Sequence, residues 1–175
     1  MPSLARQLGE TAPSSYLLRK ARLLGIVGLD ALVELASLRG CDHYRPSSPS
    51  GVQDPGQERL PDEELTILLL LGENGYAPMA VRCAAQLARS PRIVVGRLAD
   101  FAIRHKTSRV LSHIAHAGSL HDPEGTEFWQ TLLSLLPSAS FREPEVDLPH
   151  WSRFVSMPGL QRNGPAPIRW LTPRA

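Results

Sequence analysis

The fold of this chain is decided by residues 61–118, which have the sequence PDEELTILLLLGENGYAPMAVRCAAQLARSPRIVVGRLADFAIRHKTSRVLSHIAHAG. Apolar residues recur in this stretch at helical spacing, and Pro, Gly, Ser and Asn interrupt them at short intervals. A similar segment follows, with Thr126 as a cap at its start and Pro137 at its end. Helices are expected over residues 62–71, over 78–89, from 91 onward, over 107–117 and over 126–136. Because the connections are short, successive helices should pack as antiparallel hairpins.

Residues 15–39, upstream of this stretch, show the pattern of a single amphipathic helix. Leu17, Leu24 and Leu35 fall on one face, whereas charged residues collect on the opposite face. Gly40 lies just beyond the end, where a C-terminal cap is expected. No membrane span is predicted in this segment, because its longest uncharged run, residues 23–29, is seven residues and a span needs about 20. The apolar face should cover the bundle, pair with a second copy or dock in a partner's groove.

Composition divides the chain into four parts. Four Pro, three Gly and three Ser fall within residues 40–61, and the last 39 residues hold seven Pro without a helical stripe. The expected parts are an N-terminal amphipathic helix in 1–40, a flexible linker in 41–60, a helical core in 61–137 and a Pro/Arg/Trp-rich C-terminal arm in 138–175. The predicted fold class is all-α: an irregular bundle of about six helices, with helical-hairpin stacking and a Pro-rich extended C-terminal arm.

Charge is balanced in total but not along the chain. The formal net charge is +2, from 19 basic and 17 acidic residues, and 17 of the basic residues are Arg. Residues 82–109 carry seven basic residues and one acid, whereas residues 54–64 carry five acids and one Arg. Planar guanidinium groups suit forked contacts with carboxylate or phosphate. An acidic stretch therefore precedes a basic middle, and the whole chain is too balanced to bind as a polyelectrolyte.

Cysteine usage and the N-terminal residues bear on the compartment. Cys41 and Cys83 lie far apart in the sequence and form no CxxC motif, which favours a reducing compartment. The N-terminal residues lack a secretory pattern, because Glu10 and Pro13 precede any long apolar run. The expected localisation is cytoplasmic.

Catalytic signatures are missing from the sequence. It contains no GxSxG elbow, HExxH helix, Walker A loop or dinucleotide fingerprint. His113 and His116 stand three residues apart, but helical periodicity predicts that both face solvent beside Arg109, whose charge opposes metal binding. We therefore expect a protein that is not an enzyme and that needs no cofactor and no metal.

Residues 97–117 support an alternative, a basic segment that resembles a bacterial repressor helix-turn-helix at a coarse level. The turn departs from that pattern because it lacks the usual Gly, and any antiparallel helix pair has a similar rhythm. The alternative function is DNA binding through this segment. The candidate nucleic-acid-binding residues are Arg104, Lys106, Ser108, Arg109, Ser112 and His113.

The function that the sequence favours is a non-enzymatic protein–protein interaction module, as an adaptor, a chaperone-like subunit or an assembly subunit. Its partner would be another protein or a second copy of the chain. Large rings are costly to leave in water, so the C-terminal arm should lie across the helices, on the face that bears Trp129. If the arm is free instead, the same residues would meet the partner. The expected partner-binding residues are Trp151, Arg153, Phe154, Arg169 and Trp170.

Overall fold

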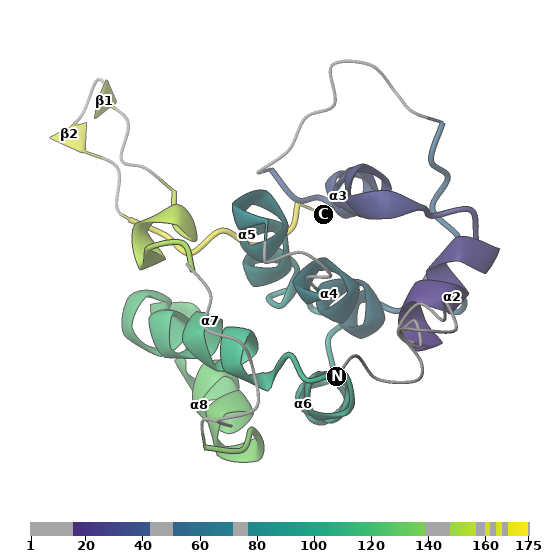
Figure 1. Ribbon diagram of the computed structural model, residues 1–175. Helices are drawn as coiled ribbons and strands as arrows, with labels where there is room; N and C mark the ends of the chain where they lie inside the picture. Colours follow the sequence, from purple (N-terminus) through teal and green to yellow (C-terminus); the bar gives the residue numbers. More distant parts are fainter. Residues whose placement is uncertain are drawn as a thin grey trace, which may run out of the picture.

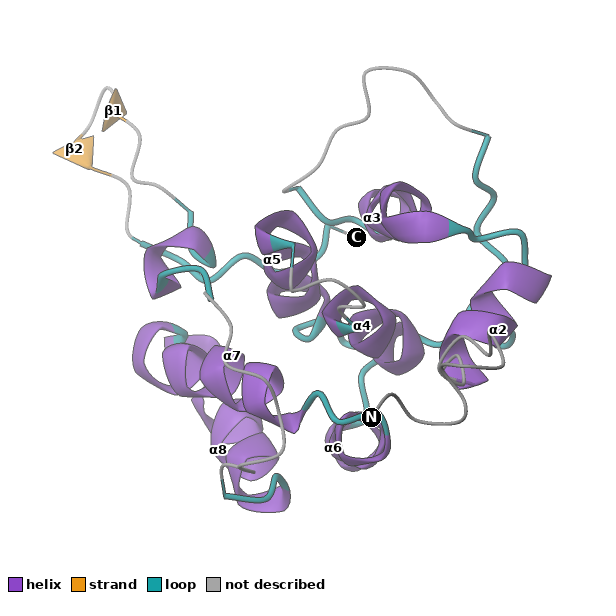
Figure 2. Ribbon diagram, in the orientation of Figure 1, coloured by secondary structure: helices purple, strands orange, loops and turns teal. Residues whose placement is uncertain are grey.

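The structure is a computed structural model that describes residues 16–42, 51–71, 77–138, 148–156, 160–161, 164–165 and 168–174. Its α-helices are α2 (Tyr16–Leu23), α3 (Gly28–Leu38), α4 (Asp62–Leu70), α5 (Pro78–Leu87), α6 (Val95–Arg104), α7 (Ser108–His121) and α8 (Thr126–Leu135). The remaining described elements are two 3-10 helices, η1 (Pro123–Gly125) and η2 (Trp151–Arg153), and an antiparallel pair of short strands, β1 (Leu160–Gln161) and β2 (Gly164–Pro165). Packed helices form the body (Figure 2), which confirms the expected all-α class.

Helix α4 lies at the centre of the helices α2, α3, α5 and α6 (Figure 1) and contacts all four. All nine of its residues are buried, which is the pattern of a core helix rather than of an amphipathic one. Its first turn is acidic, and buried carboxylates require partners. Glu64 forms an ion pair with Lys20 of α2 at 2.6 Å, and Glu63 accepts a hydrogen bond from the backbone N–H of Val94 at 3.0 Å. The acidic start of α4 therefore ties this helix to α2 and to the start of α6.

The single helix predicted over residues 15–39 is wrong, because the chain divides it into α2 and α3. Gly25 and Gly28 have positive φ angles of +79° and +83°, a conformation that residues with a Cβ atom rarely adopt. The inner faces of both helices are still buried, and Leu17 and Leu35 are each 0% exposed. The apolar face thus covers the bundle, and the described residues form seven α-helices instead of about six.

The other predicted helices are present, with shifted ends. Three of them correspond to α4, α5 and α8. Helix α6 begins at Val95 rather than at residue 91, and α7 continues past Gly118 to His121. Gly118 lies inside α7 rather than at its end. A Cβ atom at this position would clash with the indole ring of Trp129 on α8. This glycine allows α7 and α8 to approach closely.

The C-terminal residues that the structure describes lie against the helical body. Phe154 is 1% exposed and Trp170 is 5% exposed, and an antiparallel bridge joins Val155 to Trp170. The ring of Trp170 packs edge-on against Trp129 of α8, with the centroids 5.1 Å apart. Trp170 Nε1 also donates a hydrogen bond to the carbonyl oxygen of Ala85 in α5 at 3.2 Å. Docking on the helices is thus confirmed for Phe154 and Trp170.

Two predicted segments are described only in part. Residues 43–50 and 139–147 lie outside the described residues, so the flexible linker and the extended arm over 138–175 stay predictions. Residues 51–60 contain no α-helix, yet Leu60 is fully buried and Asp54 is bound to Arg39, contacts that composition did not indicate. Within the described ranges, no helix combines the length and the apolar content that a membrane crossing requires.

Candidate functional site: an arginine-lined pocket

A buried carboxylate at the start of α4 organises the candidate site. Asp62 is 0% exposed, and its two oxygens accept hydrogen bonds from side chains of three other segments. The donors are Ser90 Oγ at 2.6 Å, Gln57 Nε2 at 2.6 Å, Arg92 Nε at 2.9 Å and Arg39 Nη1 at 2.9 Å. Because a buried carboxylate without partners is costly, these donors are what stabilise Asp62 in the core.

Arg39, just after α3, is the most deeply buried partner of this carboxylate. Its side chain is 1% exposed and makes a forked contact with Asp54, from Nε to Oδ2 at 3.0 Å and from Nη2 to Oδ1 at 2.7 Å. Its Nη1 also donates to the carbonyl oxygen of Leu60 at 2.7 Å. Arg39 therefore joins the end of α3 to the chain that leads into α4.

These contacts keep both carboxylates ionised. The hydrogen bond from Arg39 is the main cause that lowers the pKa of Asp54 below its ordinary value. For Asp62, burial is the largest single effect and raises the pKa. Hydrogen bonds, first among them the one from Ser90, and the charge of Arg39 together outweigh burial, so the pKa of Asp62 is lowered. At neutral pH both groups act as fixed anions that orient the arginines.

The C-terminal residues 172–174 contact α5 and the residues that follow α3, next to this site. The backbone N–H of Arg174 donates to the carbonyl oxygen of Gly40 at 3.0 Å, and Gln86 Nε2 of α5 donates to that of Thr172 at 2.8 Å. Gly40 has a φ angle of +97°, and a Cβ atom there would clash with the backbone of Arg174. Only glycine permits this approach. The side chain of Arg174 forms an ion pair with Asp42, with Nε 2.7 Å from Oδ1.

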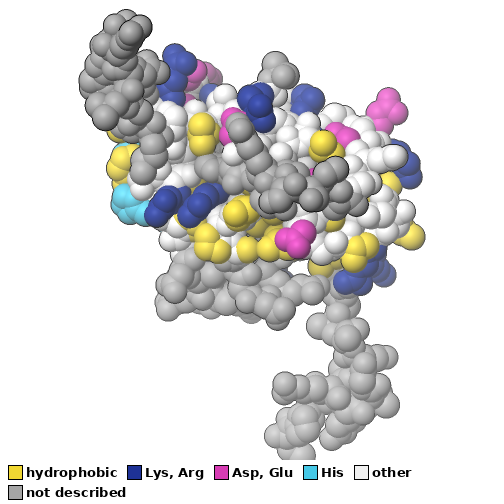
Figure 3. Space-filling model, turned by 90° about the horizontal axis from the view of Figure 1, so that it is seen from above, with side chains coloured by type: hydrophobic (Ala, Val, Ile, Leu, Met, Phe, Trp, Pro, Cys, Tyr) yellow, Lys and Arg dark blue, Asp and Glu magenta, His cyan; other side chains and the backbone are white. Residues whose placement is uncertain are grey.

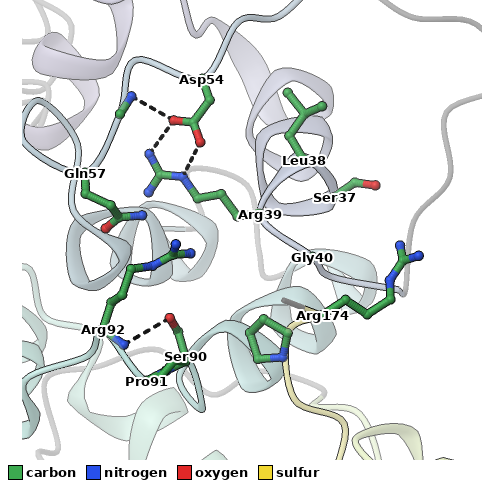
Figure 4. Close-up of a pocket in the computed structure, with 12 residues that line it drawn as sticks. Ser37, Leu38, Arg39, Gly40, Asp54, Gln57, Ser90, Pro91, Arg92 and Arg174 are labelled. Carbon is green, nitrogen blue, oxygen red and sulfur yellow. Dashed lines mark hydrogen bonds and ion pairs between the residues drawn. The ribbon is translucent and has the colours of Figure 1, made fainter.

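A pocket of about 560 Å³ lies between these segments. Its lining comprises residues 37–40, 54, 56–57, 90–92 and 173–174. Figure 4 shows Arg92 on the turn after α5 and Arg174 on the C-terminal segment at the other side, with the side chain of Arg174 extending away from Arg92. Each uses Nε for an aspartate, Arg92 for Asp62 and Arg174 for Asp42, and the two side chains are 51% and 60% exposed. In the part of the chain that the structure describes, their terminal nitrogens have no acceptor, so the pocket offers unused N–H donors.

Charges around the pocket balance one another. The ion-paired groups are the guanidinium groups of Arg39, Arg92 and Arg174 and the carboxylates of Asp42, Asp54 and Asp62. On the face shown in Figure 3, Lys and Arg side chains lie at several separate places and form no single continuous patch among the described residues. A balanced pocket with spare donors is suited to recognising one acceptor group rather than a polyanion.

The structure brings the residues predicted to bind a partner close together, with the rings of Phe154 and Trp170 5.5 Å apart between centroids, but it buries the large rings. Phe154 and Trp170 are buried inside the chain, and Trp151 is half-buried, with its ring stacked on His121 of α7 at a centroid distance of 3.7 Å. Arg153 and Arg169 are exposed. The structure thus leaves these two arginines at the surface and uses the large rings for packing.

The expected site of ring docking needs one correction. Trp170 contacts α8 as predicted, but the rings of Trp151 and Phe154 lie on α7 instead. Phe154 packs edge-on against His113, with the centroids 6.3 Å apart. Because α7 continues to His121, it presents more surface than the shorter helix that the sequence predicted.

The predicted helix-turn-helix segment corresponds to α6 and α7, joined by residues 105–107. Arg104 and Lys106 are exposed at this junction, and Lys106 has a φ angle of +57°. Arg109 is half-buried and has an interaction partner, whereas Ser108 is 4% exposed. The first turn of α7 is thus partly enclosed by the fold.

The C-terminal segment covers a further part of the same helix. His113 is half-buried, and its Nε2 lies 3.2 Å from the carbonyl oxygen of Pro149. Ser112 is also half-buried, whereas His116 is exposed. The prediction that His113 and His116 both face open solvent is therefore correct for His116 and wrong for His113, because the docking of residues near Pro149 covers the latter.

The two cysteines are buried in the core of the protein. Cys41 and Cys83 are buried free thiols, and Cys41 Sγ lies 3.6 Å from the carbonyl oxygen of Cys83. Burial raises the pKa of both thiols, to about 12 for Cys83, so they carry little thiolate at neutral pH. Among the residues that the structure describes, no group of three or more His, Cys, Asp or Glu side chains is placed to hold a metal ion.

The pocket was not predicted from the sequence, although the sequence contains one signal for it. The acidic stretch 54–64 and the basic stretch 82–109 meet in the contact between Asp62 and Arg92. The other arginines, Arg39 and Arg174, come from segments that were assigned to different parts of the chain.

No family model, no curated protein and no solved structure matches this chain.

Proposed function

We propose that this chain is a non-enzymatic protein–protein interaction module, an adaptor or a subunit of a larger assembly, which meets its partner at the arginine-lined pocket. One observation carries the proposal: Arg92 and Arg174 are each fixed through Nε by an aspartate, and their terminal nitrogens are left without an acceptor in the described part of the chain. Arginine is enriched at protein interfaces. A guanidinium group that is already held in place loses little further freedom when it binds.

The chemistry of the pocket supports binding rather than turnover. A general acid or base works best with a pKa near the operating pH, whereas the contacts of Asp54 and Asp62 lower both pKa values. The neighbouring thiol of Cys41 has a raised pKa, which disfavours the nucleophilic thiolate. The ionisable groups of this region are therefore suited to fixed electrostatic contacts.

DNA binding through residues 97–117 is the alternative proposal. It is supported by the exposed cations Arg104 and Lys106 at the junction of α6 and α7. It is weakened by the burial of Ser108 and by the contacts of His113 with the C-terminal segment. Phosphate contacts would give an affinity that falls steeply with salt, by about 0.9 decade per decade of salt for each phosphate neutralised.

Affinity purification with the full chain as bait tests the proposal. We expect a protein to co-purify in a defined stoichiometry from the native source and to be lost with the double substitution Arg92→Gln, Arg174→Gln. The comparison variant is Arg153→Gln, Arg169→Gln, which removes the two exposed arginines that the sequence predicted at the partner surface; it should retain the partner, and loss in this variant alone would place the partner there instead of at the pocket.

Three results would count against this function. One is the absence of any enriched protein with the wild-type bait. Another is equal loss of the partner in both double variants, which would indicate a general charge effect. The third is salt-sensitive co-purification of duplex DNA that Arg104→Gln and Lys106→Gln abolish, which would favour the alternative.

A further inference from the structure

The arginines of the pocket differ from ordinary surface arginines in how they are held. Arg92 donates through Nε to a carboxylate that is 0% exposed, so its guanidinium group is anchored to the core. Arg174 is anchored at both its backbone and its side chain, through Gly40 and Asp42. Two exposed side chains from segments about 80 residues apart in the sequence are thus held on opposite walls of one cavity (Figure 4).

We infer that this pocket binds a carboxylate presented by an acidic side chain of a partner protein, an inference that rests on the proposed function. The terminal nitrogens of a guanidinium group form a planar fork that matches the two oxygens of a carboxylate. Arg39 shows this geometry inside the protein, because it binds Asp54 through two parallel hydrogen bonds. Arg92 and Arg174, which both line the pocket, carry the same kind of terminal nitrogens, and the described residues bind only the Nε atoms of the two side chains.

Charge favours a carboxylate over a phosphate group. The three guanidinium groups around the pocket are already balanced by three aspartates. Asp54 and Asp42 are 36% and 31% exposed in their side chains, so they would repel a phosphate dianion more strongly than a single negative charge. One carboxylate adds the smallest charge that still satisfies the forked donors.

The rest of the lining suits a peptide rather than a free anion. Leu38 is 56% exposed beside Arg39, and Pro91 and Pro173 also line the cavity. These groups provide apolar contact for the aliphatic stem of a glutamate and for its neighbours in a chain. A volume of about 560 Å³ exceeds what a lone carboxylate needs, so part of the peptide would enter with it.

Titration of the full ¹⁵N-labelled chain with an acetylated tetraglutamate peptide tests the inference. The Nε–H signals of Arg92 and Arg174 should shift in a saturable manner, whereas those of Arg153 and Arg169 should not. An acetylated tetraglutamine peptide should cause no saturable shift, and inorganic phosphate should bind at least tenfold more weakly than tetraglutamate.

Matched variants separate loss of the pocket from loss of the fold. Arg174→Gln should weaken tetraglutamate binding at least tenfold, and Arg92→Lys should weaken it while keeping the positive charge. Arg153→Gln and Arg169→Gln should leave the affinity unchanged. Thermal melting of each variant shows whether the fold is retained. Only variants that melt at the same temperature as the wild type are used to judge the inference. If neither pocket variant melts like the wild type, the titration of the wild-type chain decides whether the inference holds.

Several outcomes would overturn the inference: no saturable shift with tetraglutamate, tighter binding of phosphate, equal binding of tetraglutamine, or unchanged affinity in a folded Arg174→Gln chain. The proposed function can fail separately. If tetraglutamate binds at Arg92 and Arg174 but no protein co-purifies, the pocket is a carboxylate-binding site and the proposed role as a protein–protein interaction module is wrong. If a protein co-purifies with both double variants and tetraglutamate does not bind, the chain binds its partner through another surface and the inference about the pocket is wrong.

Discussion

Two buried aspartates organise the two sides of this molecule in different ways. Asp62 begins α4, is 0% exposed and is bound by donors from three other segments of the chain. Asp122 follows α7, is 4% exposed and accepts hydrogen bonds from Arg89 Nε at 2.6 Å and Trp129 Nε1 at 2.7 Å. The first aspartate has two arginine partners, whereas the second has one arginine and an indole.

The surroundings of the two aspartates show what each cluster does. Around Asp62, charged groups extend outward to the pocket, so polar contacts join α3, α4 and the chain's C-terminal residues. Around Asp122, the indole of Trp129 continues into ring contacts with Phe128 and Trp170, at centroid distances of 4.9 and 5.1 Å. Similar carboxylates therefore organise a polar pocket in one region and aromatic packing in the other.

Replacing the two aspartates gives the largest expected effects. Asp62→Ala should lower the free energy of unfolding by about 4 kcal/mol, because it leaves Arg39 buried with one of its two carboxylates missing. Asp122→Ala should cost about 2 kcal/mol, because Arg89 is 19% exposed and water can reach it. Denaturant unfolding measures both values, with the exposed Asp100→Ala as a control that should change little. Equal losses at Asp62 and Asp122 would contradict the comparison.

Removing rings tests the aromatic side. Trp170→Ala should lower the free energy of unfolding by about 3 kcal/mol, as expected for a buried ring in contact with Trp129. Trp151→Ala should cost about 1.5 kcal/mol, because this ring is half-buried and stacks on His121 at the surface. Thermal and denaturant unfolding of both variants give the comparison. A larger loss for Trp151 than for Trp170 would mean that the C-terminal segment docks in another way in solution.

Local features of the fold were predictable from the sequence, because local residues determine them. Pro78 marks the start of α5, and Pro137 follows α8 closely. The break between α2 and α3 was not predicted, because Leu and Val residues continue the helical spacing across Gly25 and Gly28. Apolar periodicity extends through a glycine pair, whereas the backbone conformation at that pair depends on how the two helices pack.

The candidate site was harder to predict, because it depends on which charges meet. The chain holds 17 Arg and 17 acidic residues, and spacing gives no rule for pairing Arg39 with Asp54 or Arg174 with Asp42. The opposite charges of stretches 54–64 and 82–109 indicated attraction between them but not the particular atoms. Docking of the large C-terminal rings could be predicted, because exposing them to water is costly and hydrophobic burial needs no specific partner.

Acid should reduce the stability that the region around Asp54 and Asp62 contributes to the fold. The pKa values of Asp54 and Asp62 are lowered in the folded chain, so the unfolded chain binds more protons in acid. Their contribution to stability is therefore present above the unfolded pKa of about 3.9 and is lost as the pH falls through the folded values. Denaturant unfolding between neutral pH and acid should show this decline. Asp54→Asn should make the decline shallower, and an unchanged slope would mean that Asp54 is not bound to Arg39 in solution.

Arg174→Gln should have the smallest effect on stability and the sharpest effect on the pocket. Its ion pair with Asp42 lies at the surface, where such pairs contribute about 0–1 kcal/mol, and its backbone bond to Gly40 does not depend on the side chain. The free energy of unfolding should therefore stay close to that of the wild type, as should that of the control Asp42→Asn. Tetraglutamate binding should still fall in Arg174→Gln, because the terminal nitrogens are removed. A large loss of stability in Arg174→Gln, with Asp42→Asn unaffected, would show that the side chain supports the fold. The polar region would then resemble the aromatic one, where the same groups that could meet a partner are used for packing.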